Sequence, residues 1–102
     1  MKIAFYFNDK GFRDLDLSHP FDGNNGVGGT QYCFLMLASS LTRFYPEHEV
    51  TFYHYNHNIL PSGVDDRLVR SLDEILDCAE QDKQDMFIYK ADGICILLTK
   101  SI

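Results

Sequence analysis

The most informative stretch of the chain reads Gly26-Val27-Gly28-Gly29-Thr30-Gln31-Tyr32 and runs directly into an apolar segment, residues 33–38. It lies downstream of an opening strand-like segment, residues 2–7. Backbone N–H groups at the start of a helix attract anions, and glycines let a phosphate approach those groups closely. The stretch therefore predicts a glycine-rich loop at a helix N-terminus, in the neighbourhood of a phosphate-bearing ligand such as a nucleotide-sugar.

Strand-like and helix-like segments alternate along the chain. The predicted strands are residues 2–7, 49–55 and 85–90, and the predicted helices are residues 30–45 and a segment that begins at Asp65. The apolar tail, residues 94–102, fits a strand or a helix, and we favour a helix because the alternation places one there. This order is typical of an α/β fold, and we expect a Rossmann-like doubly wound parallel sheet. Three strands are few for a stable sheet, so residues 1–102 are expected to form a single partial domain.

Two polar loops are predicted at the carboxyl edge of this sheet. The first, residues 8–29, is rich in glycine and has few apolar anchors, and we expect it to be mobile. Loops of this length are usually functional or disordered. The second loop spans residues 56–65. Because open α/β sheets bind ligands at the carboxyl ends of their strands, both loops are candidate binding segments.

Two common phosphate-binding motifs do not fit the glycine-rich stretch. A dinucleotide-binding GxGxxG motif needs a third glycine where Gln31 stands, and it follows the first strand without a long insertion. A P-loop can be aligned only with Gly29 at the position of its essential lysine. Nucleoside triphosphate hydrolysis is therefore not expected.

A third pattern fits the order of the segments. Residues 2–6, 26–30, 37–41 and 49–52 together resemble the N-terminal domain of retaining GT-B glycosyltransferases, especially those of family four. The resemblance covers essentially the whole chain, but only the Gly-Gly pair at the helix start is motif-like. It implies that the donor diphosphate is contacted by the loop residues Gly26, Gly28, Gly29 and Thr30.

The resemblance also implies an activity and its requirements. Such an enzyme transfers a sugar from a nucleotide-sugar donor to a glycan or lipid-linked acceptor, with retention and without a metal or another cofactor. The family's second domain, with its paired glutamates, has no counterpart in residues 1–102, and neither does the later strand that carries a histidine. The chain is therefore expected to be a truncated transferase that is inactive alone, and no catalytic residue is assigned.

A second polar cluster lies at the end of the second predicted strand. It contains His54, Tyr55 and His57, side chains with the hydrogen-bonding groups and aromatic faces that sugars require. We predict that these three residues lie on the acceptor side of the site. The alternative is a solvated loop. A metal site is not favoured, because the two histidines lack an obvious acidic third ligand.

Composition restricts the partners and the compartment. The formal net charge of −6 argues against a nucleic-acid partner, because binding to a phosphate backbone needs a basic surface. Cys33, Cys78 and Cys95 form no CxxC pair and are expected to be buried free thiols. With no signal-peptide pattern and no apolar window of transmembrane length, we predict a cytoplasmic location, with peripheral membrane contact as an alternative. The oligomeric state is not predicted.

The alternative function is a non-catalytic binding module of the flavodoxin or response-regulator type. A response regulator needs an acidic pair after its first strand and an aspartate at the end of its third. Asn8-Asp9 is a weak version of the first feature, and Lys90 stands at the position of the second. The glycosyltransferase interpretation is therefore preferred.

Overall fold

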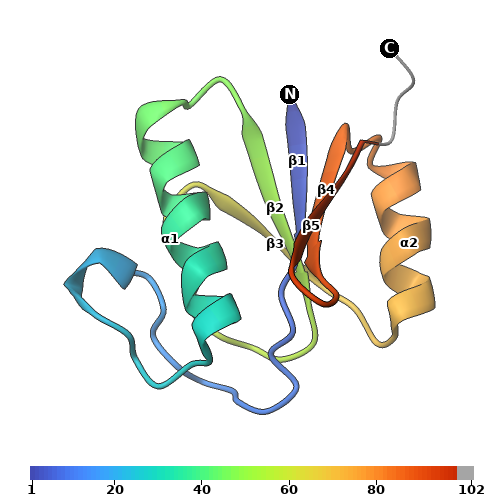
Figure 1. Cartoon of the computed structure of the whole chain (residues 1–102). Helices are drawn as coiled ribbons and strands as arrows, with labels where there is room; N and C mark the ends of the chain where they lie inside the picture. The colour runs from blue at the N-terminus through green and yellow to red at the C-terminus, as the bar shows by residue number, and fades with distance from the viewer. Residues whose placement is uncertain (99–102) are drawn as a thin grey trace.

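The computed structural model describes residues 1–98 and shows a five-stranded sheet between two helices (Figure 1). In chain order its elements are β1 (Lys2–Tyr6), the 3₁₀ turn η1 (Pro20–Asp22), α1 (Gly29–Phe44), β2 (Glu49–His54), β3 (Val64–Leu68), α2 (Leu72–Gln81), β4 (Met86–Lys90) and β5 (Ile94–Leu98). The strand order is β3-β2-β1-β4-β5. The predicted α/β class is confirmed, and the topology is compatible with a Rossmann-like fold.

β1 lies at the centre of the sheet and is parallel to both of its neighbours. Its residues Lys2 to Tyr6 pair with Glu49 to Tyr53 of β2, and Ile3 to Phe5 pair with Met86 to Ile88 of β4. β3 extends the parallel part beyond β2, whereas β5 is antiparallel to β4. The sheet is therefore mixed, and it has five strands where the sequence predicted three parallel ones.

Apolar side chains on both faces of the sheet explain why a helix covers each face. Ile3, Phe5 and Phe52 face α1 and pack with its buried Phe34 and Leu35. On the opposite face, Ala4, Tyr53 and Phe87 pack with Ile75 and Ala79 of α2. Each face of β1 is thus buried under one helix, which accounts for the continuous apolar run of its sequence.

The first helix follows the prediction closely at both ends. Tyr45, the residue after α1, is its C-cap, and Pro46 cannot continue the helix. The buried face of α1 carries Phe34, Leu35 and Ala38, whereas Leu37 and Tyr45 are exposed. Cys33 is also exposed, so it is not the buried thiol that was expected, while Cys78 and Cys95 are half-buried.

The segment that begins at Asp65 is an edge strand, and the predicted helix starts one element later. β3 pairs with β2 from Val64 to Leu68, and α2 begins after Ser71, whose hydroxyl accepts a hydrogen bond from the backbone N–H of Glu74. The error arose because Asp65 and Asp66 fit the acidic first turn of a helix. An edge strand whose side chains are largely exposed gives no alternating apolar pattern that would reveal it.

The tail also forms a strand where a helix was favoured. Ile94–Leu98 folds back on β4 as an antiparallel hairpin, with the backbone N–H of Ala91 donating to the carbonyl of Gly93 at 2.9 Å. A short apolar run fits a strand or a helix equally well, and the pairing with β4 decides between them. The rest of the predicted tail helix, residues 99–102, lies outside the described residues.

Within residues 1–98, no helix has the length and apolar character needed to cross a membrane.

Candidate functional site

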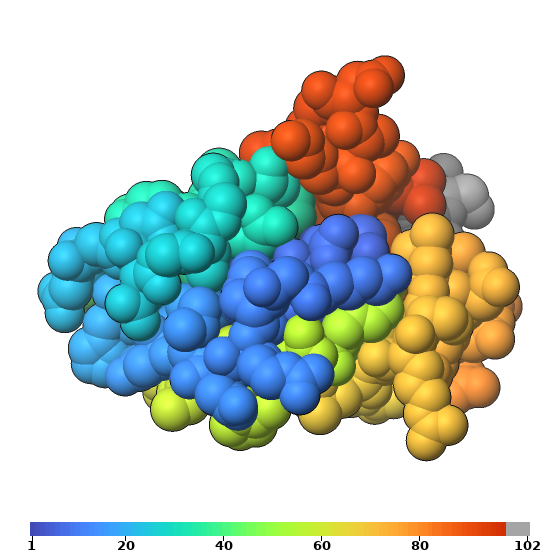
Figure 2. Space-filling view, turned by 90° about the horizontal axis from the view of Figure 1, so that it is seen from below, coloured from blue at the N-terminus to red at the C-terminus, as the bar shows by residue number. Residues whose placement is uncertain are grey.

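The carboxyl ends of β1 and β4 meet the start of α1 at one point of the sheet. From β1 the chain passes through α1 to β2 on one side, and β4, which follows α2, lies on the other side. Figure 2 shows this edge from below, where the loop after β1 meets the start of α1 and the β4–β5 turn. Open α/β sheets bind ligands at such crossover points, because the loops there diverge and leave a crevice.

A cavity of about 220 Å³ occupies this point, which we call the crossover cavity. Its lining residues are Tyr6, Asn8, Thr30, Gln31, Phe34, Lys90 and Ala91. Lys90 is the charged residue of this lining, and it is exposed at the end of β4. The cavity therefore combines a cation with the N-terminus of α1.

The N-terminus of α1 is open to a ligand. Gly28 is the N-cap, with an extended backbone and no side-chain hydrogen bond, and the backbone N–H of Tyr32 makes the first helical bond to its carbonyl at 2.9 Å. The N–H groups of Gly29, Thr30 and Gln31 precede that bond and have no partner within the helix. They give this end of α1 a partial positive charge.

The structure explains the three glycines of residues 26–32 in different ways. Gly26 has a φ of +92°, which side chains rarely adopt. A Cβ on Gly28 would come within 2.5 Å of Gln31 Oε1, the end of a flexible side chain that would have to move. That Gln31 side chain folds back and donates to the carbonyl of Asn8 at 3.0 Å. At Gly29, in contrast, a Cβ would meet no atom within 4 Å and the φ is not positive. The conformation and packing of the described chain therefore do not require glycine at position 29.

Of the four predicted donor-side residues, Thr30 lines the crossover cavity. Gly28 and Gly29 form the start of the helix beside it, and Gly26 is exposed in the preceding turn. In that turn, the Asn24 side chain accepts hydrogen bonds from the N–H groups of Gly26 and Val27. Sequence analysis did not predict Lys90 as a site residue. The feature that could have indicated it is a cation at the end of a strand beside β1.

The three predicted acceptor-side residues lie in different environments. His54 is fully buried, whereas His57 is exposed and its Nδ1 lies 3.2 Å from Asp14 Oδ1. Tyr55 is half-buried, and its hydroxyl is 3.0 Å from the hydroxyl of Tyr6. Because Tyr6 lines the crossover cavity, Tyr55 connects the second loop to that cavity.

Sequence analysis missed a buried polar network around Asp9. The carboxylate of Asp9, which is fully buried, accepts hydrogen bonds from the backbone N–H of Tyr55 at 2.6 Å and from Asn58 Nδ2 at 3.0 Å. His54 Nδ1 lies 2.7 Å from the same carboxylate, and His54 Nε2 hydrogen-bonds to Asp66. Polar residues that end the neighbouring strands β1 and β2 were the signal that could have indicated it.

Both ring nitrogens of His54 face carboxylates, which only accept hydrogen bonds when ionised, so the geometry fits the imidazolium form. Burial lowers the pKa of His54, but hydrogen bonds and attraction from Asp9 and Asp66 outweigh burial and raise the pKa above its ordinary value. Burial raises the pKa of Asp9, but the hydrogen bonds from His54 and the Tyr55 backbone outweigh it and lower the pKa. The network therefore holds a buried ion pair.

These two shifts predict how stability depends on pH. A raised His54 pKa stabilises the fold fully below about pH 6.5, and the contribution is lost as the pH rises through the folded-state value. A lowered Asp9 pKa stabilises the fold above about pH 4, and that contribution is lost as the pH falls through the folded-state value. Urea unfolding at several pH values should therefore show the pair's contribution at its maximum between about pH 4 and 6.5.

The matched control for this pH dependence is the exposed pair of His57 and Asp14. His57→Gln should leave the fall in stability above about pH 6.5 unchanged, whereas His54→Gln should reduce it. An identical pH profile for wild type and His54→Gln would contradict the assignment.

Comparison with known proteins found no protein similar to this chain. No family model, no curated protein and no solved structure matches the chain. Among the described residues, no group of three histidine, cysteine or acidic side chains is arranged to hold a metal ion. The function is therefore argued from the crossover cavity and the loops around it.

Proposed function

We propose that the crossover cavity binds the diphosphate of a nucleotide-sugar, and that this chain forms the N-terminal, donor-phosphate side of a retaining GT-B glycosyltransferase. The supporting observation is the position of the open N-terminus of α1 beside Lys90, in a cavity between β1 and β4. An anion there would meet backbone N–H groups and an ammonium group from two different elements. The small volume suits a phosphate group better than a whole nucleotide-sugar.

The chemistry of a retaining transfer fits these groups. Negative charge develops on the departing diphosphate, and N–H groups that are already aimed at it stabilise that charge without reorganising. Gly29 supports this role, because open space around its Cα allows a phosphate oxygen to come close to the backbone. Lys90 would supply the compensating positive charge.

The second loop would then lie on the acceptor side. Tyr55 connects this loop to the cavity through Tyr6, and His57 is exposed to solvent. His54 would act indirectly, because its buried ring is bonded to Asp9 of the first loop and to Asp66 of β3, and so joins that loop to the sheet. Residues 1–102 supply no assigned catalytic group and no assigned site for the nucleoside, so the chain alone is expected to be inactive.

The alternative, a response-regulator-like module, has less support from the geometry. Such a module needs an accessible acidic pair after β1 and an aspartate at the end of the third predicted strand, which is β4. Asp9 is fully buried and bonded within its network, and β4 ends in Lys90.

Nuclear magnetic resonance titration of the 102-residue chain with pyrophosphate and with uridine and guanosine diphosphates tests the proposal. The amide resonances of residues 28–31 and of Lys90 should shift in each titration. Lys90→Gln should weaken pyrophosphate binding by about fivefold, as expected for the loss of about 1 kcal/mol of partly screened attraction.

The matched control is Lys83→Gln, which removes the same charge from an exposed residue between α2 and β4, at the opposite edge of the sheet. It should leave pyrophosphate affinity unchanged. Equal effects of the two substitutions would mean that net charge alone attracts the anion, and an absence of shifts in residues 28–31 would contradict the proposed site.

A further inference from the structure

A larger hollow lies on the flank of α1, away from the crossover cavity. It has a volume of about 470 Å³ and is bounded by η1, the C-terminal half of α1 and the loop before β3. In Figure 1 the η1 segment stands beside α1, on the side away from the β4–β5 hairpin. Its helix residues lie about two to three turns after Gln31, which lines the crossover cavity, and the two cavities share no lining residue. We call this second cavity the flank hollow.

Hydroxyl groups and opposite charges line one part of the flank hollow. Ser39, Thr42 and Ser62 bring hydroxyl groups from α1 and from the loop before β3, and Asp22 and Arg43 bring a carboxylate and a guanidinium. The lining thus offers both hydrogen-bond donors and acceptors. The negative charge of Asp22 offsets the positive charge of Arg43 in this lining, so the hollow is not suited to a simple anion.

An exposed aromatic ring lines another part. The side chain of Phe21 is 47% exposed, although η1 is anchored through Pro20, which is buried and whose carbonyl accepts a hydrogen bond from the Tyr32 hydroxyl at 2.8 Å. The guanidinium of Arg43 lies 5.9 Å from the centre of the Phe21 ring. A large apolar side chain is therefore held at the surface beside a hollow that also carries hydroxyl groups and charges, where it can contact a ligand.

We propose that the flank hollow binds a neutral carbohydrate of one or two sugar units. A sugar ring presents hydroxyl groups at its edge, which donate and accept hydrogen bonds, and C–H groups on its faces. The hydroxyl groups of the lining, with Asp22 and Arg43, suit hydrogen bonds to the edge of the sugar ring. The ring of Phe21 suits packing against one of its faces. The volume lies within the range of small-molecule sites.

Titration of the 102-residue chain with maltose, cellobiose and N,N′-diacetylchitobiose, followed by nuclear magnetic resonance, tests this site. At least one disaccharide should shift the amide resonances of residues 18, 19, 21 and 22 and of residues 39–43, with an affinity in the millimolar range. Phe21→Ala should weaken that binding by about tenfold, because the apolar contact of the sugar face is lost.

Phe44→Ala is the matched control, because Phe44 is also exposed and lies 5.5 Å from the same guanidinium but does not line the hollow. It should leave disaccharide affinity unchanged. An equal loss in both variants, shifts only outside these segments, or no shift with any disaccharide would overturn the proposal. Pyrophosphate should not shift residues 39–43, so a failure at one cavity is distinguishable from a failure at the other.

Discussion

Replacing Asp9 with alanine is expected to lower the free energy of unfolding by about 3–5 kcal/mol, the usual cost of removing one partner of a buried ion pair. The substitution leaves His54 buried without its main counter-charge. It also removes the acceptor for the backbone N–H of Tyr55 and for Asn58 Nδ2. Urea unfolding followed by circular dichroism measures the loss.

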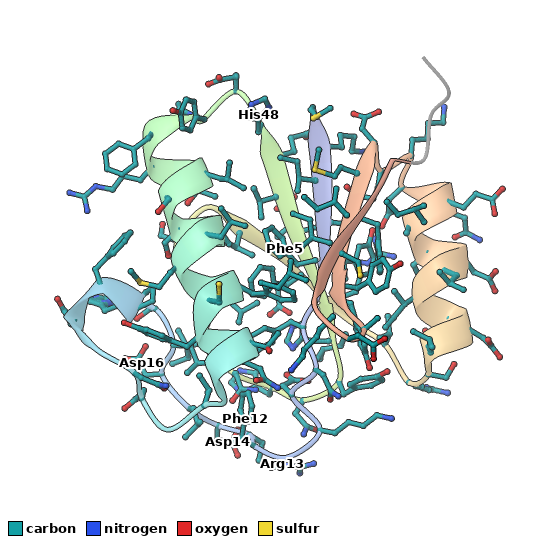
Figure 3. The ribbon with its side chains drawn as sticks, viewed as in Figure 1. Phe5, Phe12, Arg13, Asp14, Asp16 and His48 are labelled. Carbon is teal, nitrogen blue, oxygen red and sulfur yellow. The ribbon has the colours of Figure 1, made fainter. Side chains whose placement is uncertain are left out.

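Asp14→Ala provides the control for this prediction. Asp14 belongs to the same loop and also pairs with a histidine, but its side chain is 73% exposed, and Figure 3 shows it at the outer end of the molecule beside Arg13. Exposed ion pairs contribute about 0–1 kcal/mol. If Asp9→Ala cost no more than Asp14→Ala, the buried network would not be holding the two loops to the sheet.

Replacing Phe5 with alanine is expected to cost about 3–5 kcal/mol as well, because the deletion leaves a cavity in the main core. The ring of Phe5 is fully buried, and its centre lies 5.4 Å from that of Phe34 on α1 and 5.2 Å from that of Phe52 on β2. Figure 3 shows Phe5 between α1 and the sheet. Against a typical stability of about 5–15 kcal/mol, such a loss would bring the chain close to unfolding.

Thermal or urea unfolding measures this loss, with Phe44→Ala as the control. The side chain of Phe44 is 63% exposed at the end of α1, so its removal should change stability by about 0.5 kcal/mol or less. A similar small change for Phe5→Ala would mean that α1 is not packed on the sheet through this ring.

The parts that sequence analysis predicted correctly are those with a strong local signal. β1, β2 and α1 were found close to their observed limits, because β1 and β2 are buried and α1 carries apolar residues at helical spacing before Pro46. The edge strands β3 and β5 were predicted as helices. Their sequences have no alternating pattern, and their conformation depends on pairing with β2 and β4.

The candidate site likewise has one part that the local sequence predicted and another that depends on the tertiary structure. The sequence of residues 26–32 was sufficient to predict a glycine-rich helix start, because glycine content and helix onset are local properties. Only the tertiary structure placed Lys90 beside that helix start and buried Asp9 against His54, since strand pairing brings together residues that are far apart in the chain. The same pairing gave His54 a structural environment that its residue type alone did not indicate, because burial and charge partners depend on the neighbours that the fold supplies.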